Sequence, residues 1–272
     1  MTRREFLSLT AGAVAGYSLG TGGKVWGEPL RVNHQTIKIS NLSQALVGIR
    51  IVLMSDFHHS DWIPAARIRE AVRIANTLKP DVVALTGDFI HRGREWVPAC
   101  FRELAALRAR FGVFAVLGNH DHYAGAAGAI RQAMKSAGIL ELSNSGLRVR
   151  RNGSEFRVAG LPDLWHGRPR IHRALGSLGD EASMLLLSHN PDFAQDLDDP
   201  RVALMLSGHT HGGQVRLPIL GAPWTPSRFG TRYLSGLCHG PKSRVFVTNG
   251  VGGSFPGLRI NAPAEIACLT LA

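Results

Sequence analysis

The sequence predicts an α/β fold with two β-sheets and flanking helices. Up to about residue 140, short apolar runs alternate with longer segments of helical period, which is typical of a mostly parallel sheet. After that point, short strands are separated only by brief helical patches. Polar residues of metal-binding type directly follow five of the predicted strands. With 272 residues, 44% hydrophobic and 19% charged, the chain can bury a substantial core.

The first half of the chain predicts strands alternating with helices. Ile68, Val72 and Ala75 recur three or four residues apart in the first helix, and Lys79-Pro80 ends it. We expect strands at 49–54, 82–85 and 113–117, and helices at 64–78, 96–110 and 124–137. This order begins a mostly parallel sheet.

The second half predicts shorter strands and a second, more antiparallel sheet. Asn152-Gly153 is a typical hairpin turn between two of these strands. The expected strands are 147–150, 156–159, 184–187, 204–206, 245–248 and 266–271. The sequence has no internal repeat and no linker rich enough to mark a boundary, so we expect one domain from about residue 35 to 272.

The N-terminus matches a twin-arginine export signal. Arg3-Arg4 precedes a weakly apolar stretch, 8–17, that Gly12 and Gly16 dilute. We therefore expect residues 1–27 to direct export, and the protein to be periplasmic or in the cell envelope. Either cleavage of this segment or its retention as a membrane anchor fits, and an ordinary basic first helix is the alternative.

The chain is basic, with 31 Lys+Arg against 20 Asp+Glu and a formal net charge of +11. Removing residues 1–27 takes away three basic residues and one acidic residue, which leaves 28 minus 19, or +9. Nucleic acid, anionic lipid and phosphorylated small molecules all fit this charge, and a high arginine share can also reflect composition alone. Three cysteines without a C-x-x-C spacing exclude a disulfide framework.

The polar residues after the five strands form a pattern of metal ligands. Asp-x-His and His-x-His place two side chains on one side of an extended segment. Carboxylate, amide and imidazole ligands suit Mn²⁺, Fe or Zn²⁺ better than Ca²⁺. Seven ligands suit two ions that share one carboxylate. The candidates are Asp56, His58, Asp88, Asn119, His189, His209 and His211.

The order of these motifs over residues 50–213 resembles the calcineurin-like metallophosphoesterase family. The segments 188–192, 208–215, 249–252 and 258–266 are similar to those of bacterial exported or membrane-associated phosphodiesterases, a group that includes hydrolases of the lipid A precursor UDP-diacylglucosamine. The resemblance implies a β-sandwich of two mixed sheets flanked by helices, with the metal site at the carboxyl ends of the strands. It also implies two divalent ions, Mn²⁺ first and Fe or Zn²⁺ as alternatives.

The resemblance also assigns the ligands. One ion would be held by Asp56, His58 and His211, and the other by Asn119, His189 and His209. Asp88 would bridge the two ions. A hydroxide between the ions would be the nucleophile, because two metals lower the pKa of bound water.

His120 is expected to protonate the leaving oxygen, and Asp121 to orient it. His59 and His91 each lie within three residues of a ligand and are candidate substrate contacts. The loops 161–169 and 219–233, which carry Trp165 and Trp224, are expected to form a wall near the metals.

These residues predict a phosphoesterase that acts on a phosphodiester or pyrophosphate of a small molecule or of a lipid-linked substrate, with an anionic membrane surface as a further partner. Hydrolysis of the lipid A precursor takes place on the cytoplasmic side, so that substrate fits the export signal only if the segment is an anchor. A nuclease of the same fold is one alternative, which the lack of an aromatic and basic stripe disfavours. A non-catalytic scaffold is another, which the complete ligand set disfavours. No obligate protein partner is inferred.

Overall fold

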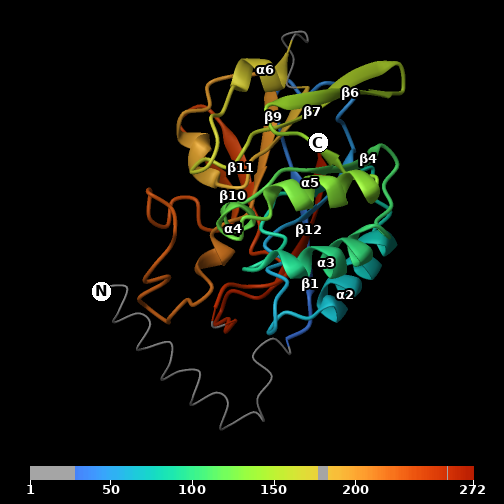
Figure 1. The fold of residues 1–272 in the computed structure, drawn as a ribbon. Helices are drawn as coiled ribbons and strands as arrows, with labels where there is room; N and C mark the ends of the chain where they lie inside the picture. The colour runs from blue at the N-terminus through green and yellow to red at the C-terminus, as the bar shows by residue number, and fades with distance from the viewer. Residues whose placement is uncertain (1–27, 177–182, 256) are drawn as a thin grey trace.

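The computed structural model describes residues 28–176, 183–255 and 257–272, and shows two six-stranded sheets packed face to face (Figure 1). The predicted export segment, 1–27, lies outside the described residues. Within the described residues, all strands and helices lie between Arg31 and Leu271, and none of the helices is long and apolar enough to cross a bilayer.

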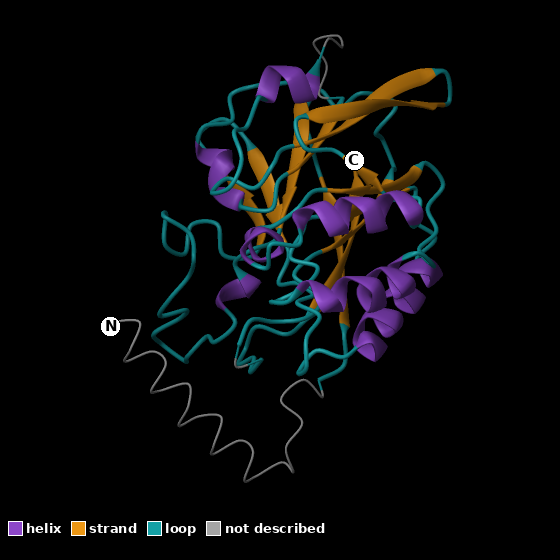
Figure 2. Ribbon diagram, in the orientation of Figure 1, coloured by secondary structure: helices purple, strands orange, loops and turns teal. Residues whose placement is uncertain are grey.

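The first sheet is mainly parallel, and helices cover its outer face (Figure 2). Its strands, in spatial order, are β1 (Arg31–Ile37), β12 (Glu265–Leu271), β2 (Arg50–Met54), β3 (Val82–Leu85), β4 (Gly112–Ala115) and β5 (Leu140–Glu141). The covering helices are α2 (Ala65–Thr77), α3 (Val97–Leu104), which follows η1 (Arg94–Trp96), and α5 (Ala127–Ser136). Only the pairing of β12 with β2 is antiparallel.

The second sheet is also mixed. Its strands, in spatial order, are β10 (Gly236–His239), β11 (Arg244–Val247), β9 (Val202–Ser207), β8 (Met184–Leu187), β7 (Ser154–Gly160) and β6 (Ser145–Arg151). Two short helices, α6 (Ile171–Leu175) and η2 (Pro191–Gln195), lie on its outer side. The predicted hairpin turn is confirmed, since Asn152 and Gly153 both have positive φ between β6 and β7.

The core follows from the alternation of side chains along the strands. In β2, Ile51 and Leu53 point toward the second sheet, where they pack with Phe156 and Leu185. The intervening side chains, such as Val52, pack instead with α2 and α3. Both faces of the first sheet are therefore buried, which explains why its strands are continuous apolar runs. The prediction of a two-sheet α/β fold is confirmed.

Several finer predictions were wrong, because distant partners decide them. The strand at 266–271 belongs to the first sheet, between β1 and β2. Three of the five pairings in the second sheet are parallel, so antiparallel pairs are a minority there, although more frequent than in the first sheet. The helix expected at 96–110 ends at Leu104. The helix expected at 124–137 is α5 alone, preceded by the short α4 (Asn119–Tyr123). The sheet begins at Arg31, before the start expected at residue 35.

Candidate metal centre

Both sheets contribute candidate ligands to one site at their carboxyl ends. In the first sheet, Asp56 and His58 follow β2, Asp88 follows β3, and Asn119 follows β4. In the second sheet, His189 follows β8, and His209 and His211 follow β9. All seven side chains are buried, and none is more than 7% exposed. The seam between the two sheets thus collects every ligand that the sequence predicts.

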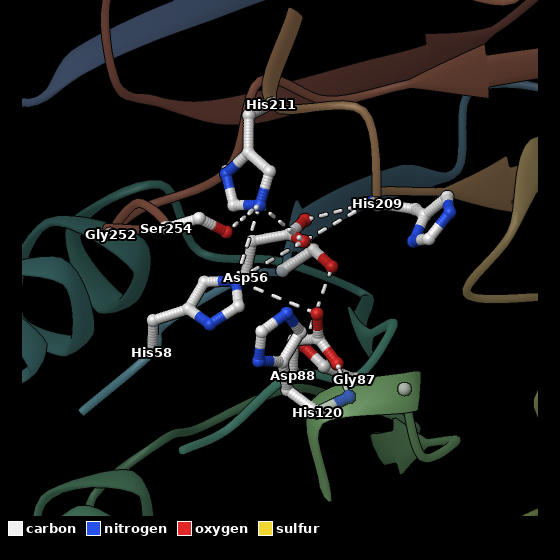
Figure 3. A network of polar contacts seen from close by, with 12 residues as sticks. Asp56, His58, Gly87, Asp88, His120, His209, His211, Gly252 and Ser254 are labelled. Carbon is white, nitrogen blue, oxygen red and sulfur yellow. Dashed lines mark hydrogen bonds and ion pairs between the residues drawn. The ribbon is translucent and has the colours of Figure 1, made fainter. Parts of the chain in front are cut away.

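One group of donor atoms consists of Asp56, His58 and His211 (Figure 3). Nε2 of His58 lies 3.2 Å from Nε2 of His211. Oδ1 of Asp56 lies 3.5 Å from Nε2 of His211 and 3.8 Å from Nε2 of His58. Metal–ligand bonds of ~2.1 Å at right angles would place neighbouring donor atoms ~3 Å apart. These three side chains therefore fit one ion.

A second group forms around His189. Its Nε2 lies 3.0 Å from Oδ1 of Asn119 and 3.1 Å from Nδ1 of His209. Nδ1 of His189 donates to the carbonyl oxygen of Thr86 at 2.7 Å, which leaves Nε2 as the donor atom for a metal. This group has the nitrogen and oxygen donors that a second ion requires.

Asp88 lies between the two groups. Its Oδ2 is 3.5 Å from Nε2 of His58 in the first group and 3.3 Å from Nε2 of His189 in the second. Its Oδ1 accepts the backbone N–H of His120 at 2.8 Å. The position of this carboxylate is the one that a bridging ligand needs.

The electrostatics of the centre favour a bound cation. Burial lowers the pKa of His189, but the Asp88 and Asp56 carboxylates outweigh it and raise this pKa to about 10. Burial also lowers the pKa values of His58, His209 and His211 well below their usual range. Without a metal, a protonated His189 is thus the counter-charge to the carboxylates, and a metal ion would replace that charge.

Two glycines allow the ligand loops to approach each other. A Cβ on Gly118 would collide with the Asp88 carboxylate, and a Cβ on Gly208 would collide with the Asp56 carboxylate and with Ser55. The sequence places these glycines directly before Asn119 and His209. Their absent side chains are therefore a condition for the close packing of the centre.

His120 lies beside the centre, but Asp121 does not orient its ring. Nδ1 of His120 donates to the carbonyl oxygen of His91 at 3.1 Å. The Asp121 carboxylate instead accepts backbone N–H groups, those of Gly118, Asp88, Phe89 and Ile90. We therefore correct the expected role: Asp121 holds together the loops that carry Asp88 and Asn119, and the His91 carbonyl orients His120.

Of the two further histidines, only His91 reaches the centre. Its ring is 4.8 Å from that of His120, and its Nδ1 is 3.4 Å from Nδ1 of His58. His59 is turned away, because its Nδ1 contacts the Ile63 carbonyl at 2.7 Å and its ring packs edge-on against Trp96. This placement contradicts a direct substrate contact by His59.

A cavity of about 460 Å³ adjoins His91 and was not expected from the sequence. Trp62 connects the two, since its ring lies 4.8 Å from that of His91 and 5.8 Å from that of Phe255. Its other lining residues include Trp96 and the exposed Arg92. This cavity is the nearest described space into which a substituent on the phosphate could extend.

Arg259 is a second feature whose role the sequence did not reveal. Its buried guanidinium donates to the carbonyl oxygens of Gly252, Asn249 and Ala262, and to that of the ligand His211 at 3.2 Å. The segment 258–261 was recognised as a motif, but nothing in its composition showed that its arginine points inward. Arg259 fixes the backbone next to His211.

The two predicted wall loops differ in their relation to the centre. Trp165, in the loop 161–169, places its ring 4.8 Å from that of His209. The loop 219–233 instead contacts η2, where Ser227 Oγ and the backbone N–H of Arg228 donate to the Asp192 carboxylate. Only the first loop is a wall of the centre.

The sequence of residues 49–213 matches the family described as calcineurin-like phosphoesterase. The chain is 34% identical over 281 residues to the metallophosphoesterase YkuE of Bacillus subtilis, covering 100% of this chain and 98% of that protein. It is 32% identical over 276 residues to Phosphodiesterase YaeI of Escherichia coli, covering 100% of this chain and 99% of that protein. Among solved structures, TT1561 of Thermus thermophilus aligns with a TM-score of 0.46 and 15% identity, over 75% of this chain and 91% of that one. The chain belongs to the calcineurin-like phosphoesterase family, whose members use divalent metals, and is a hydrolase of phosphoric esters.

Proposed function

We propose that this protein hydrolyses a phosphodiester or a pyrophosphate with the help of two divalent ions, Mn²⁺ first among them. The observation that carries this proposal is the Asp88 carboxylate, which lies between two groups of donor atoms from different sheets. The relative named a phosphodiesterase supports a diester over a monoester.

The chain supplies the ligands and a proton donor. When bound, the ions would lower the pKa of water and stabilise negative charge on the phosphoryl oxygens. Asp56, His58 and His211 would hold one ion, and Asn119, His189 and His209 the other, with Asp88 shared. His120 keeps Nδ1 bonded to the His91 carbonyl, so Nε2 is the atom that would donate a proton to the leaving oxygen.

The substrate and the compartment are part of the same proposal. The arginine pair Arg3-Arg4 supports export by the twin-arginine route to the periplasm or cell envelope, with residues 1–27 removed or kept as an anchor. The charge of +9 on residues 28–272 supports an anionic substrate, and a lipid-linked phosphate would unite this charge with a location at the membrane.

The test compares hydrolysis of bis-p-nitrophenyl phosphate with that of p-nitrophenyl phosphate by residues 28–272. Activity is measured after treatment with a chelator and after adding back Mn²⁺, Zn²⁺, Fe²⁺ or Mg²⁺ singly. We expect chelation to abolish activity, Mn²⁺ to restore it, and the diester to be the better substrate. A protein that binds no metal would overturn the proposed mechanism, and a clear preference for the monoester would overturn the proposed bond type.

A further inference from the structure

A tight hairpin beyond the ligand His211 exposes two large apolar side chains to solvent. Leu217 and Gly221 pair through both backbone hydrogen bonds, at 2.8 and 2.9 Å. At the tip, Ile219 is 105% exposed and Leu220 is 74% exposed. We call the segment 217–221 the apolar prong. In Figure 1 it belongs to the orange loop that extends away from the sheets.

The backbone of the prong is strained at its tip. The N–H of Leu220 donates to the carbonyl oxygen of Pro218 at 2.7 Å, and the residue between them, Ile219, has φ 68°. This is the rarer kind of γ-turn, and a β-branched residue with positive φ is a true outlier. A glycine would relieve the strain, and a polar residue would remove the exposed apolar surface. The prong therefore has two unfavourable features that folding alone does not require.

The surroundings of the prong match the boundary between water and lipid. Trp224 is 49% exposed and Phe229 is 39% exposed, and both follow the prong in the same loop. Arg228 and Arg232 of this loop are also exposed. Aliphatic side chains at a tip, aromatic rings beside them and arginines nearby are the composition that binds to the surface of an anionic bilayer.

We propose that the apolar prong inserts into an anionic lipid bilayer. Its base is fixed to the loop that carries His211: Ala222 packs over Gly213, and Nε of Arg216 donates to the carbonyl oxygen of Gly212 at 2.6 Å. Insertion would therefore hold the metal centre close to the membrane surface. This proposal goes beyond the hydrolytic function and does not depend on it, because binding to vesicles is measured without catalysis.

The test is sedimentation of residues 28–272 with vesicles of phosphatidylglycerol and phosphatidylcholine, and with vesicles of phosphatidylcholine alone. These residues contain every described strand and helix, and they exclude binding through the N-terminal segment. We expect binding to the anionic vesicles that salt weakens. The double variant I219S/L220S should bind at least ~10-fold more weakly, because two inserted aliphatic side chains are lost. The control L147S changes an apolar side chain that is 43% exposed on β6, on the far side from the prong in Figure 1, and should bind like the wild type.

A second variant, I219G, tests the strain separately. Glycine adopts φ 68° without strain, so I219G should raise the midpoint of urea unfolding while weakening vesicle binding severalfold. Three results would overturn the proposal: equal vesicle binding by wild type and I219S/L220S, no binding by the wild type, or lipid-free dimers that the double variant abolishes, which would make the prong a surface between copies. A lower unfolding midpoint in I219G would refute the strain.

Discussion

The ligand loops and the β6–β7 hairpin solve the same backbone problem with different residues. At the hairpin, positive φ falls on Asn152 and Gly153, residue types that adopt it readily. In the ligand loops, five of the seven predicted ligands have positive φ. These are Asp56 at 53°, His58 at 46°, Asp88 at 54°, His209 at 73° and His211 at 53°. The hairpin residues suit their backbone conformation, whereas the ligand residues suit a chemical task and are held in a conformation that most of them disfavour.

The difference shows where the rest of the structure is working against local preference. Strained residues persist only when their surroundings fix them. The buried Asp121 carboxylate accepts four backbone N–H groups from the loops around Asp88, and the buried Arg259 holds the backbone beside His211. The hairpin has no comparable need, because its conformation is local. Variants that pair a site residue with a counterpart elsewhere can test this contrast.

The largest effect is expected for Asp88→Asn. Loss of the shared carboxylate charge should lower hydrolysis by roughly 10³-fold or more. Metal analysis should find fewer than two ions for each chain. The control is Asp81→Asn at the opposite end of the same strand, β3, where Asp81 accepts the backbone N–H of Arg50 at 2.9 Å. This control should keep its metal and activity, and an equal loss in both variants would remove the distinction between the two ends of the sheet.

His120→Ala should lower turnover without loss of metal. No described contact makes His120 a member of either group around Asp88, and removal of a general acid typically costs ~10²-fold or more on substrates with poor leaving groups. Esters of nitrophenol, which leave without a proton, should be affected far less. His172→Ala, on the exposed helix α6, is the matched control and should change neither property. Loss of metal in His120→Ala would instead make His120 a ligand.

Gly208→Ala should weaken metal binding, because the new methyl group would collide with the Asp56 carboxylate and Ser55. We expect at least ~10-fold lower affinity and a loss of about 1–3 kcal/mol in the free energy of unfolding. Gly153→Ala, at φ 82° with no atom within 4 Å, should cost only about 1 kcal/mol and leave metal affinity unchanged. Both are measured by urea unfolding and metal titration. A larger loss of stability at Gly153 would show that backbone strain outweighs close packing at Gly208.

The sequence predicted those parts of the fold that local patterns determine. The buried apolar runs at β2, β3 and β4 were predicted as strands because both faces of this sheet are covered. β1 was missed because its residues are mostly polar and half-exposed, and the sheet assignment of 266–271 was wrong because its partners, Arg31–Ile37 and Arg50–Met54, are more than 200 residues away.

The same division holds for the site. All seven predicted ligands converge because each directly follows a strand, and the ends of strands in a sheet lie together. The side-chain directions of Asp121, His59 and Arg259 did not follow from the sequence. Asp121 had two sets of possible partners, the His120 ring and the backbone amides, and only the tertiary structure decides between them.

The smallest effect is a count of protons, and it tests the charge in the ligand loops. The raised pKa of His189, about 10, means that its imidazole is protonated at pH 7.5, whereas lowered pKa values leave His58, His209 and His211 neutral. Metal binding requires a bare Nε2 on His189, so it should release about one proton or more from each chain. Four imidazoles with ordinary pKa values would together release less than about half a proton at this pH. Calorimetric titration of the metal-free protein with Mn²⁺, in buffers of different ionisation enthalpy, measures this number. The release should stay constant from pH 7 to 8.5, because the folded pKa of His189 lies above that range, and a release below half a proton would mean that the carboxylates do not hold a charged histidine.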